Sequence, residues 1–256
     1  MAEGSVEIHK PKPVHSWREL LSEIAVVVVG VVIALSAEQA LQGIELRAKV
    51  RHAEEQMRVE LALDDGPQVL QRIALAPCIE ESLTRIRAAI EQGESRAAVV
   101  EAVERFDPPR HTWDSVAFQA ATVSNVLPHL PADRLWRWAY VYAMMPLLDR
   151  ADEREFLDVA RIRALSKVGG PLVEAERGRM LEAVEALRRD NEDIVAHVTP
   201  TAGAIRELGI RVVLHAKPPS EVYAPAGPSR VVEQLKRLPM AAACVPALEQ
   251  AMRDSP

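Results

Sequence analysis

The chain has 256 residues, of which 48% are hydrophobic, 27% charged and only 4% aromatic. This balance disfavours a disordered chain, and the scarcity of aromatic residues favours helices over sheets, so we expect an all-α protein. The formal net charge is −6 and no basic stripe is present, which argues against a nucleic-acid partner, because phosphate binding requires clustered lysine and arginine.

The N-terminal part of the sequence carries the strongest signal in the chain. After residues 1–15, which we expect to be a disordered tail, residues 16–45 are predicted to form one transmembrane anchor helix. Its centre, Ile24–Ala37, has no charge and reads IAVVVVGVVIALSA, so a helix here is apolar on every face. The window from Leu20 to Glu38 has a mean hydropathy of about 2.2, which is typical of helices that cross a lipid bilayer.

Two other interpretations of this apolar run stay open. The first alternative is a buried central strand of a soluble protein. The second is the apolar region of a cleaved signal peptide, with Ala34-Leu35-Ser36 as the cleavage site. Glu23 at the start of the run favours an uncleaved anchor instead. Arg18 lies closer to the hydrocarbon than any basic residue beyond it, which favours a cytoplasmic N-terminus and a large periplasmic domain at a bacterial inner membrane.

Small residues recur along one face of the predicted anchor. Gly30, Ala34 and Ala37 have helical spacing, and such a face allows two membrane helices to approach closely. The sequence therefore suggests a homodimer through the anchor helix, although glycine and alanine are common in any spanning helix.

A helical domain of about seven helices is expected over residues 46–214. An apolar stripe continues from the anchor into water, either as a coiled-coil seam or as a face that packs on the domain's own helices: Leu46, Val50, Ala53, Met57 and Leu61. We expect the helix to break at Asp64–Pro67 and the next to be interrupted at Pro77, because proline lacks the backbone N–H. Ser95 is a predicted N-cap for a helix that reaches about Arg105.

The second half of the domain is also predicted to be helical. A helix start at Thr112–Ser115 leads to about Leu127, and Pro131 opens a helix with two apolar faces that continues through the charged residues up to Gly169. Residues 172–197 form a long amphipathic helix, and Thr199-Pro200 is expected to start another. Residues 215–230 are a proline-rich loop, and residues 231–256 hold short C-terminal helices.

No catalytic or metal-binding motif is present. The seven histidines form no HxxxH or HExxH pair, and no glycine-rich phosphate-binding loop is found, so we expect no metal and no cofactor. The two cysteines, Cys78 and Cys244, either form a disulfide in an exported domain or are two buried thiols.

Aromatic residues and arginines concentrate in two stretches of the sequence. They suggest a pocket for an anionic or planar ligand, although the rings can equally be the domain's core with arginine stems at its edge. The speculative ligand-binding residues are Arg110, Trp113, Arg134, Trp136, Arg137 and Tyr140.

The anchor segment Leu21–Gln39, LSEIAVVVVGVVIALSAEQ, resembles that of a group of uncharacterised bacterial membrane proteins. In this group the anchor begins E-I-[VA]-V-V, ends G-[VI]-x-I-A-L and leads into a long charged helix. Glu23, Ile24, Gly30 and Ile33-Ala34-Leu35 carry the match. The resemblance implies a single-pass membrane protein with a helical domain of unknown function, and it implies no catalytic residues.

These observations favour a non-enzymatic scaffold or interaction module that is tethered to a lipid bilayer and binds an unknown protein partner. One alternative is a sensor domain that binds a small molecule among its tryptophan- and arginine-rich helices. A membrane-tethered enzyme with an unrecognised site is the other.

Overall fold

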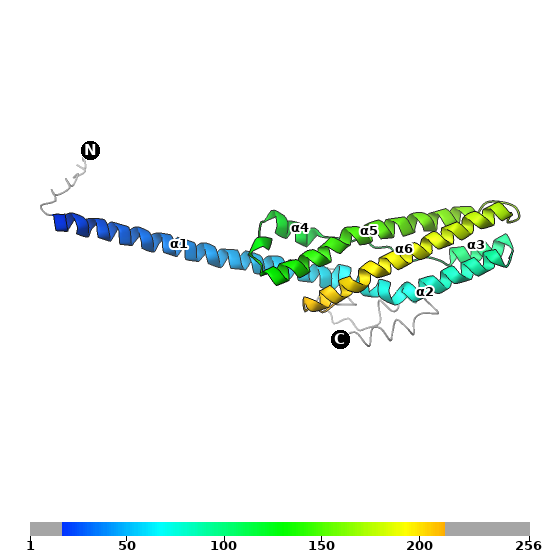
Figure 1. Ribbon diagram of the computed structural model, residues 1–256, viewed down its shortest axis with the longest axis horizontal. Helices are drawn as coiled ribbons and strands as arrows, with labels where there is room; N and C mark the ends of the chain where they lie inside the picture. The colour runs from blue at the N-terminus through cyan, green and yellow to red at the C-terminus, as the bar shows by residue number, and fades with distance from the viewer. Residues whose placement is uncertain (1–16, 213–256) are drawn as a thin grey trace, which may run out of the picture. The chain divides into compact units, whose positions relative to one another are not determined.

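The computed structural model describes residues 17–212, and every regular element in that range is helical, which confirms the all-α prediction (Figure 1). The elements, in chain order, are α1 (Trp17–Glu60), the π-helical turn η1 (Leu61–Asp65), α2 (Gly66–Glu91), α3 (Arg96–Glu104), α4 (Val116–Val123), the 3-10 turn η2 (Leu127–His129), α5 (Ala132–Ser166) and α6 (Glu174–Glu207). The predicted tail, proline-rich loop and C-terminal helices lie outside the described residues.

Internal contacts divide the chain at Arg51 and His52, inside α1, into two compact units. In the first unit, α1 contains a window of mean hydropathy 2.5 in which no residue is buried. Val26 and Ile33 are 71% and 63% exposed, so this run has no protein partner among the described residues. It is a helix and not a strand, and it is long and apolar enough to span a membrane.

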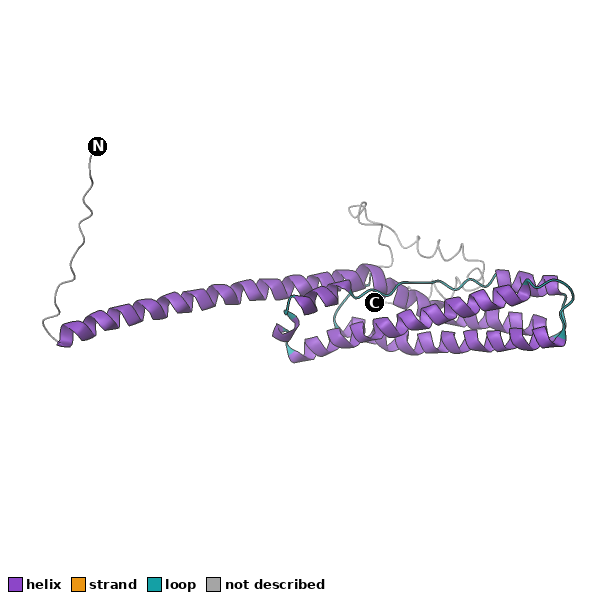
Figure 2. Ribbon diagram, turned by 90° about the horizontal axis from the view of Figure 1, so that it is seen from above, coloured by secondary structure: helices purple, strands orange, loops and turns teal. Residues whose placement is uncertain are grey.

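The second unit, which begins at His52, is called the helical domain below. Its three long helices lie side by side, with α6 packed against both α2 and α5, and α3 packed against α2 and α5 (Figures 1 and 2). Residues 106–115, called the connecting segment, have no regular structure and run back along the helices from α3 to α4 (Figure 2).

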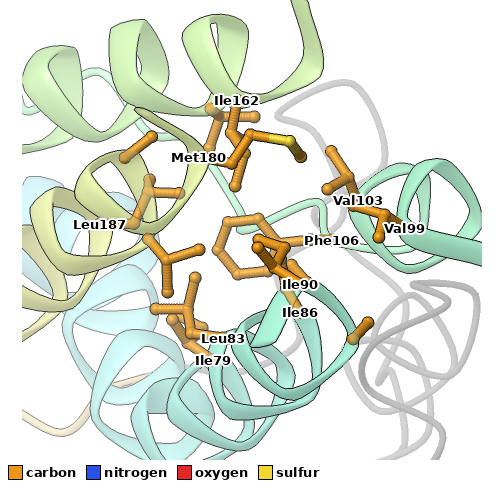
Figure 3. Packing of buried hydrophobic residues seen from close by; sticks show 14 of the residues in the cluster. Ile79, Leu83, Ile86, Ile90, Val99, Val103, Phe106, Ile162, Met180 and Leu187 are labelled. Carbon is orange, nitrogen blue, oxygen red and sulfur yellow. The ribbon is translucent and has the colours of Figure 1, made fainter. Parts of the chain in front are cut away.

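An apolar cluster fills the domain at the α3 end. Figure 3 shows the Phe106 ring between Ile86 and Ile90 of α2 and Met180 of α6, with the α3 valines beside it. Phe106 is 1% exposed, so the first residue of the connecting segment fixes where that segment leaves α3. At the opposite end of the domain Ala53, Met57 and Leu61 are also buried. This part of the predicted stripe therefore packs within the chain's own domain.

Five α-helices follow α1 in the described residues, fewer than the expected seven. The predicted interruptions at Pro77 and Pro200 are wrong, because both prolines lie inside continuous helices. Proline costs about 3 kcal/mol in a helix interior, but buried side chains on both sides of each proline hold the helix against its neighbours. These side chains are Leu75, Cys78 and Ile79 around Pro77, and Val198, Thr201 and Ala204 around Pro200.

Local signals predicted other boundaries correctly. The Ser95 hydroxyl accepts a hydrogen bond from the Ala98 N–H at 3.3 Å and caps α3, and α5 begins directly after Pro131. The helix expected from Thr112–Ser115 to Leu127 is shorter, because α4 ends at Val123.

The expected break at Asp64–Pro67 is instead the wide turn η1, which joins α1 to α2 without a loop. The Gly66 N–H donates to the Leu61 carbonyl and closes this turn. A Cβ atom on Gly66 would lie 2.1 Å from that carbonyl oxygen and 2.9 Å from a methyl group of Val212. Only glycine therefore fits here without displacing backbone.

We predict that Gly66→Ala destabilises the protein by about 1–3 kcal/mol, because the Leu61 carbonyl must move away from the added methyl group. Gly178→Ala is the matched control, since Gly178 is an exposed glycine in α6 where an added methyl group meets open space. It should stabilise by about 0.5–1 kcal/mol. Unfolding of the full-length protein in detergent, followed by circular dichroism, measures both changes; a neutral Gly66→Ala would contradict the steric argument.

Candidate functional site

The structure places the aromatic and arginine residues grouped by the sequence in two separate regions. Arg110 and Trp113 lie on the connecting segment, while the other four lie in the first turns of α5: Arg134, Trp136, Arg137 and Tyr140. Trp113 contacts Asp152, which lies about 24 Å further along α5 than Trp136. The six residues therefore do not share one cavity.

The group at the start of α5 has a mainly surface position. Trp136 is 67% exposed and stacks on Tyr140 at a ring distance of 5.5 Å. Arg134 Nη1 lies 3.0 Å from Glu54 Oε1, and Arg137 Nη1 donates to the Glu207 carbonyl at 2.9 Å. The two arginines thus attach α5 to the ends of α1 and α6.

A layer of buried polar side chains crosses the helical domain and separates two apolar parts of its core. The polar layer consists of residues that are each at most 6% exposed: Asp65, Arg72, Asp152, Glu155, Asp190 and Asn191. The apolar cluster of Figure 3 begins on one side of this layer. Leu61, Leu148 and Ile194 are buried on the other side.

Arg72 is the centre of the polar layer because it contacts two other helices. Its Nη2 forms an ion pair with Glu155 Oε1 of α5 and lies 3.4 Å from Asn191 Oδ1 of α6. The Asn191 amide in turn donates to the Ala76 carbonyl at 3.3 Å. One guanidinium group therefore links all three long helices.

The connecting segment is attached to the polar layer by two side chains. The Trp113 indole N–H donates to Asp152 Oδ2 at 2.7 Å, and His111 Nε2 lies 3.1 Å from Asp65 Oδ1. The two rings meet edge to face, with centroids 4.8 Å apart. Trp113 is 7% exposed, so this ring closes one side of the layer.

Burial raises the pKa of all four carboxyl groups in the polar layer, those of Asp65, Asp152, Glu155 and Asp190, above their ordinary values. For Asp152 the loss of hydration outweighs the hydrogen bond from Trp113, and for Glu155 it outweighs the charge of Arg72. For Asp65 it outweighs the contact with His111. Each group therefore holds its proton more tightly in the folded chain than in water.

Several polar atoms of the layer have no hydrogen-bond partner within the described part of the chain. They include Asp152 Oδ1, Asp65 Oδ2 and the Nε and Nη1 atoms of Arg72. A buried polar atom without a partner costs about 1–3 kcal/mol of folding free energy. Several such atoms in the polar layer therefore lower the stability of the folded chain. Such atoms can be satisfied by a water molecule, an ion or another bound polar group.

A pocket of about 240 Å³ opens onto the polar layer. Its buried end is formed by Asp152 and Glu155, and its outer part is formed by the connecting segment and α5: Asp107, Pro108, Pro109, Arg110, Phe156, Val159 and Arg163. Arg163 is held by the Phe106 carbonyl and by Asp107 Oδ1, both at 2.8 Å. The Arg110 guanidinium lies over the Phe156 ring at 4.2 Å.

Charged groups and apolar side chains both line the pocket. In residues 17–212, no group of three or more candidate ligands is arranged to hold a metal ion. His111, the histidine nearest to the pocket, pairs with Asp65, and no hydroxyl or thiol in that range hydrogen-bonds to its ring.

The other predicted site residues stay predictions. Gly30, Ala34 and Ala37 are exposed on α1, and open space surrounds Gly30, but a second chain is required to test packing there. Cys78 is 1% exposed in α2. Cys244 lies outside the described residues.

Sequence reasoning missed Arg72, Asp152 and Glu155, although a signal for them exists. In α5 the buried positions recur at steps of three and four: Met145, Leu148, Asp152, Glu155, Val159 and Ile162. Two acids therefore occupy positions of an otherwise apolar stripe, and Arg72 stands seven residues before Ile79 in the stripe of α2. Polar residues in such a stripe are costly and mark either structural specificity or a site.

We predict that Asp152→Asn reduces the pH dependence of stability. Burial raises the pKa of Asp152 above its ordinary value of 3.8. The protonated carboxyl therefore stabilises the folded chain fully below pH 3.8, and this stabilisation is lost as the pH rises through the folded-state pKa. Asparagine does not titrate and retains an oxygen for the Trp113 indole. Between about pH 4 and about pH 8, the free energy of unfolding of the wild type should therefore fall relative to that of the variant. Urea titrations at both pH values measure the difference; a relative gain by the wild type at high pH would refute the assignment.

Comparison of the chain with protein-family models, with curated proteins and with solved structures found no match. The resemblance of the anchor segment to the bacterial membrane proteins therefore stays a prediction, and functional inference depends on the geometry of the helical domain.

Proposed function

We propose that this chain is a membrane-anchored, non-enzymatic binding protein whose helical domain takes up a small polar molecule. The observation that supports this proposal is the pocket between the connecting segment and α5, whose buried end is lined by the acidic residues Asp152 and Glu155. A ligand that supplies a hydrogen-bond donor here offsets the cost of the polar layer, so binding couples directly to stability.

The proposed site differs from the sensor site suggested by the sequence. Only Arg110 of the predicted ligand-binding residues lines the pocket, and Trp113 supports it through Asp152. The ligand is held by one connecting segment and one long helix.

A scaffold that binds a protein partner is the second candidate function. It is favoured by exposed apolar side chains on α4 and α5, where Val116, Val123 and Trp136 are 64%, 87% and 67% exposed. Apolar groups of this size at a surface are common at protein interfaces. Loss of partner capture in Val123→Ser and Trp136→Ser, with ligand binding retained, would favour this function over the first.

We predict that a library of small water-soluble metabolites contains a compound that raises the Tm of the full-length protein in detergent. The shift should be abolished by Asp152→Asn, which removes the charge at the buried end of the pocket. Asp149→Asn is the matched control, since Asp149 is exposed on α5 and does not line the pocket. A library without any shift that depends on Asp152 would contradict the binding function.

The proposed location is a bacterial inner membrane, with one spanning helix in α1, a cytoplasmic N-terminus and a periplasmic helical domain. Support comes from the exposed apolar run of α1 and from Arg18 at its start. The same helix is proposed to pair with that of a second copy through Gly30, Ala34 and Ala37, whose small side chains allow close packing.

We predict that the full-length protein sediments with membranes and is released by detergent but not by alkaline carbonate. A Val28→Arg/Val31→Arg variant should lose this association, because each arginine near the centre of a spanning helix costs about 2.5–3.5 kcal/mol. Val168→Arg, at an exposed position after α5, is the control that should remain in the membrane fraction. Reporter fusions at both ends then determine the orientation, and unchanged sedimentation of the double variant would argue against insertion of this run.

A further inference from the structure

Only some of the charged residues that line the pocket form ion pairs. At the outer part Arg163 binds Asp107, and at the buried end Glu155 binds Arg72. Two charged groups of the pocket remain, Arg110 and Asp152. Neither of them lies within ion-pair distance of an opposite charge in residues 17–212, although the Asp152 carboxyl accepts from the Trp113 indole and also feels the charge of Arg72.

The two remaining charges have opposite sign and different depth. Arg110 is exposed at the outer part, where its guanidinium lies 4.2 Å from the centre of the Phe156 ring and its N–H groups can donate to an anion. Asp152 is 4% exposed at the buried end. Their separation exceeds the reach of a salt bridge, so they do not neutralise each other directly.

The walls between these charges are apolar. Pro108, Pro109, Phe156 and Val159 line the pocket and offer carbon surface without hydrogen-bonding side chains. The volume of about 240 Å³ is below the usual range of about 300–1,000 Å³ for drug-sized ligands, which indicates a small molecule.

We infer that the pocket binds a small zwitterion, a compound with an ammonium group and a carboxylate joined by a short carbon chain, as in an amino acid. The ammonium group lies at the buried end beside the acidic residues Asp152 and Glu155, the carboxylate accepts from Arg110, and the carbon chain lies against the prolines and Phe156. This inference rests on the proposed binding function and specifies its ligand class. A simple anion leaves the acidic buried end of the pocket without a cation, and a simple amine leaves Arg110 without a counter-charge.

The test uses the full-length protein in detergent micelles and a series of ω-amino acids from glycine to 6-aminohexanoate, with butyrate and butylamine as single-charge probes. Calorimetric titration should show that the best member of the series binds about tenfold or more tightly than either single-charge probe. Arg110→Gln should remove this advantage over butylamine. Arg110 is exposed, so this variant keeps the fold, and Arg161→Gln on the outer surface of α5 is the matched control that retains full affinity.

Two results would overturn the inference. Equal affinity for butyrate or butylamine and for the best amino acid would show that one of the two charges has no role. Absence of binding by the whole series would reject the ligand class, while a metabolite whose Tm shift depends on Asp152 would leave the binding function itself intact. Failure of both experiments would reject the function as well.

Discussion

The ion pair between Arg72 and Glu155 is the interaction on which the arrangement of the helical domain depends. Neither group is accessible to water, so each carries a desolvation cost that only the other, together with Asn191, offsets. Because these residues lie on α2, α5 and α6, the contact is made only when the three helices have one relative register. The apolar residues on either side of the ion pair can still pack after a small shift of one helix along another, whereas the same shift would separate the two buried charges.

The sequence allowed much of the fold to be predicted where the controlling interactions are local. The Ser95 cap and the start of α5 after Pro131 depend on a few neighbouring residues, and both were predicted correctly. The predictions at Pro77 and Pro200 were wrong because the tendency of proline to end a helix is outweighed by the burial of side chains on both sides of it. That burial is contributed by other helices and is not visible in a window of sequence.

The site was less accessible to sequence reasoning than the fold. Arg110 and Trp113 were singled out by residue type, and they do lie near the pocket, but their partners come from α5 at a distance in sequence that no motif records. The connecting segment has no periodicity, so its course along the helices cannot be inferred from spacing. The acids of the polar layer occupy positions in a heptad-like stripe of apolar residues, and this position distinguishes them from solvated charges. Without that comparison they look like ordinary surface acids in the sequence.

The absence of a loop at η1 has a mechanical consequence. From His52 to Glu91 the backbone passes through α1, η1 and α2 as one uninterrupted helical rod. Torque applied at one end of such a rod is transmitted to the other because no loop interrupts it, and the π-helical turn is a place where the hydrogen-bond pattern departs from that of the α-helix. Asp65 lies in that turn and holds His111. A change in the geometry of this turn would therefore change the contact between the rod and the connecting segment.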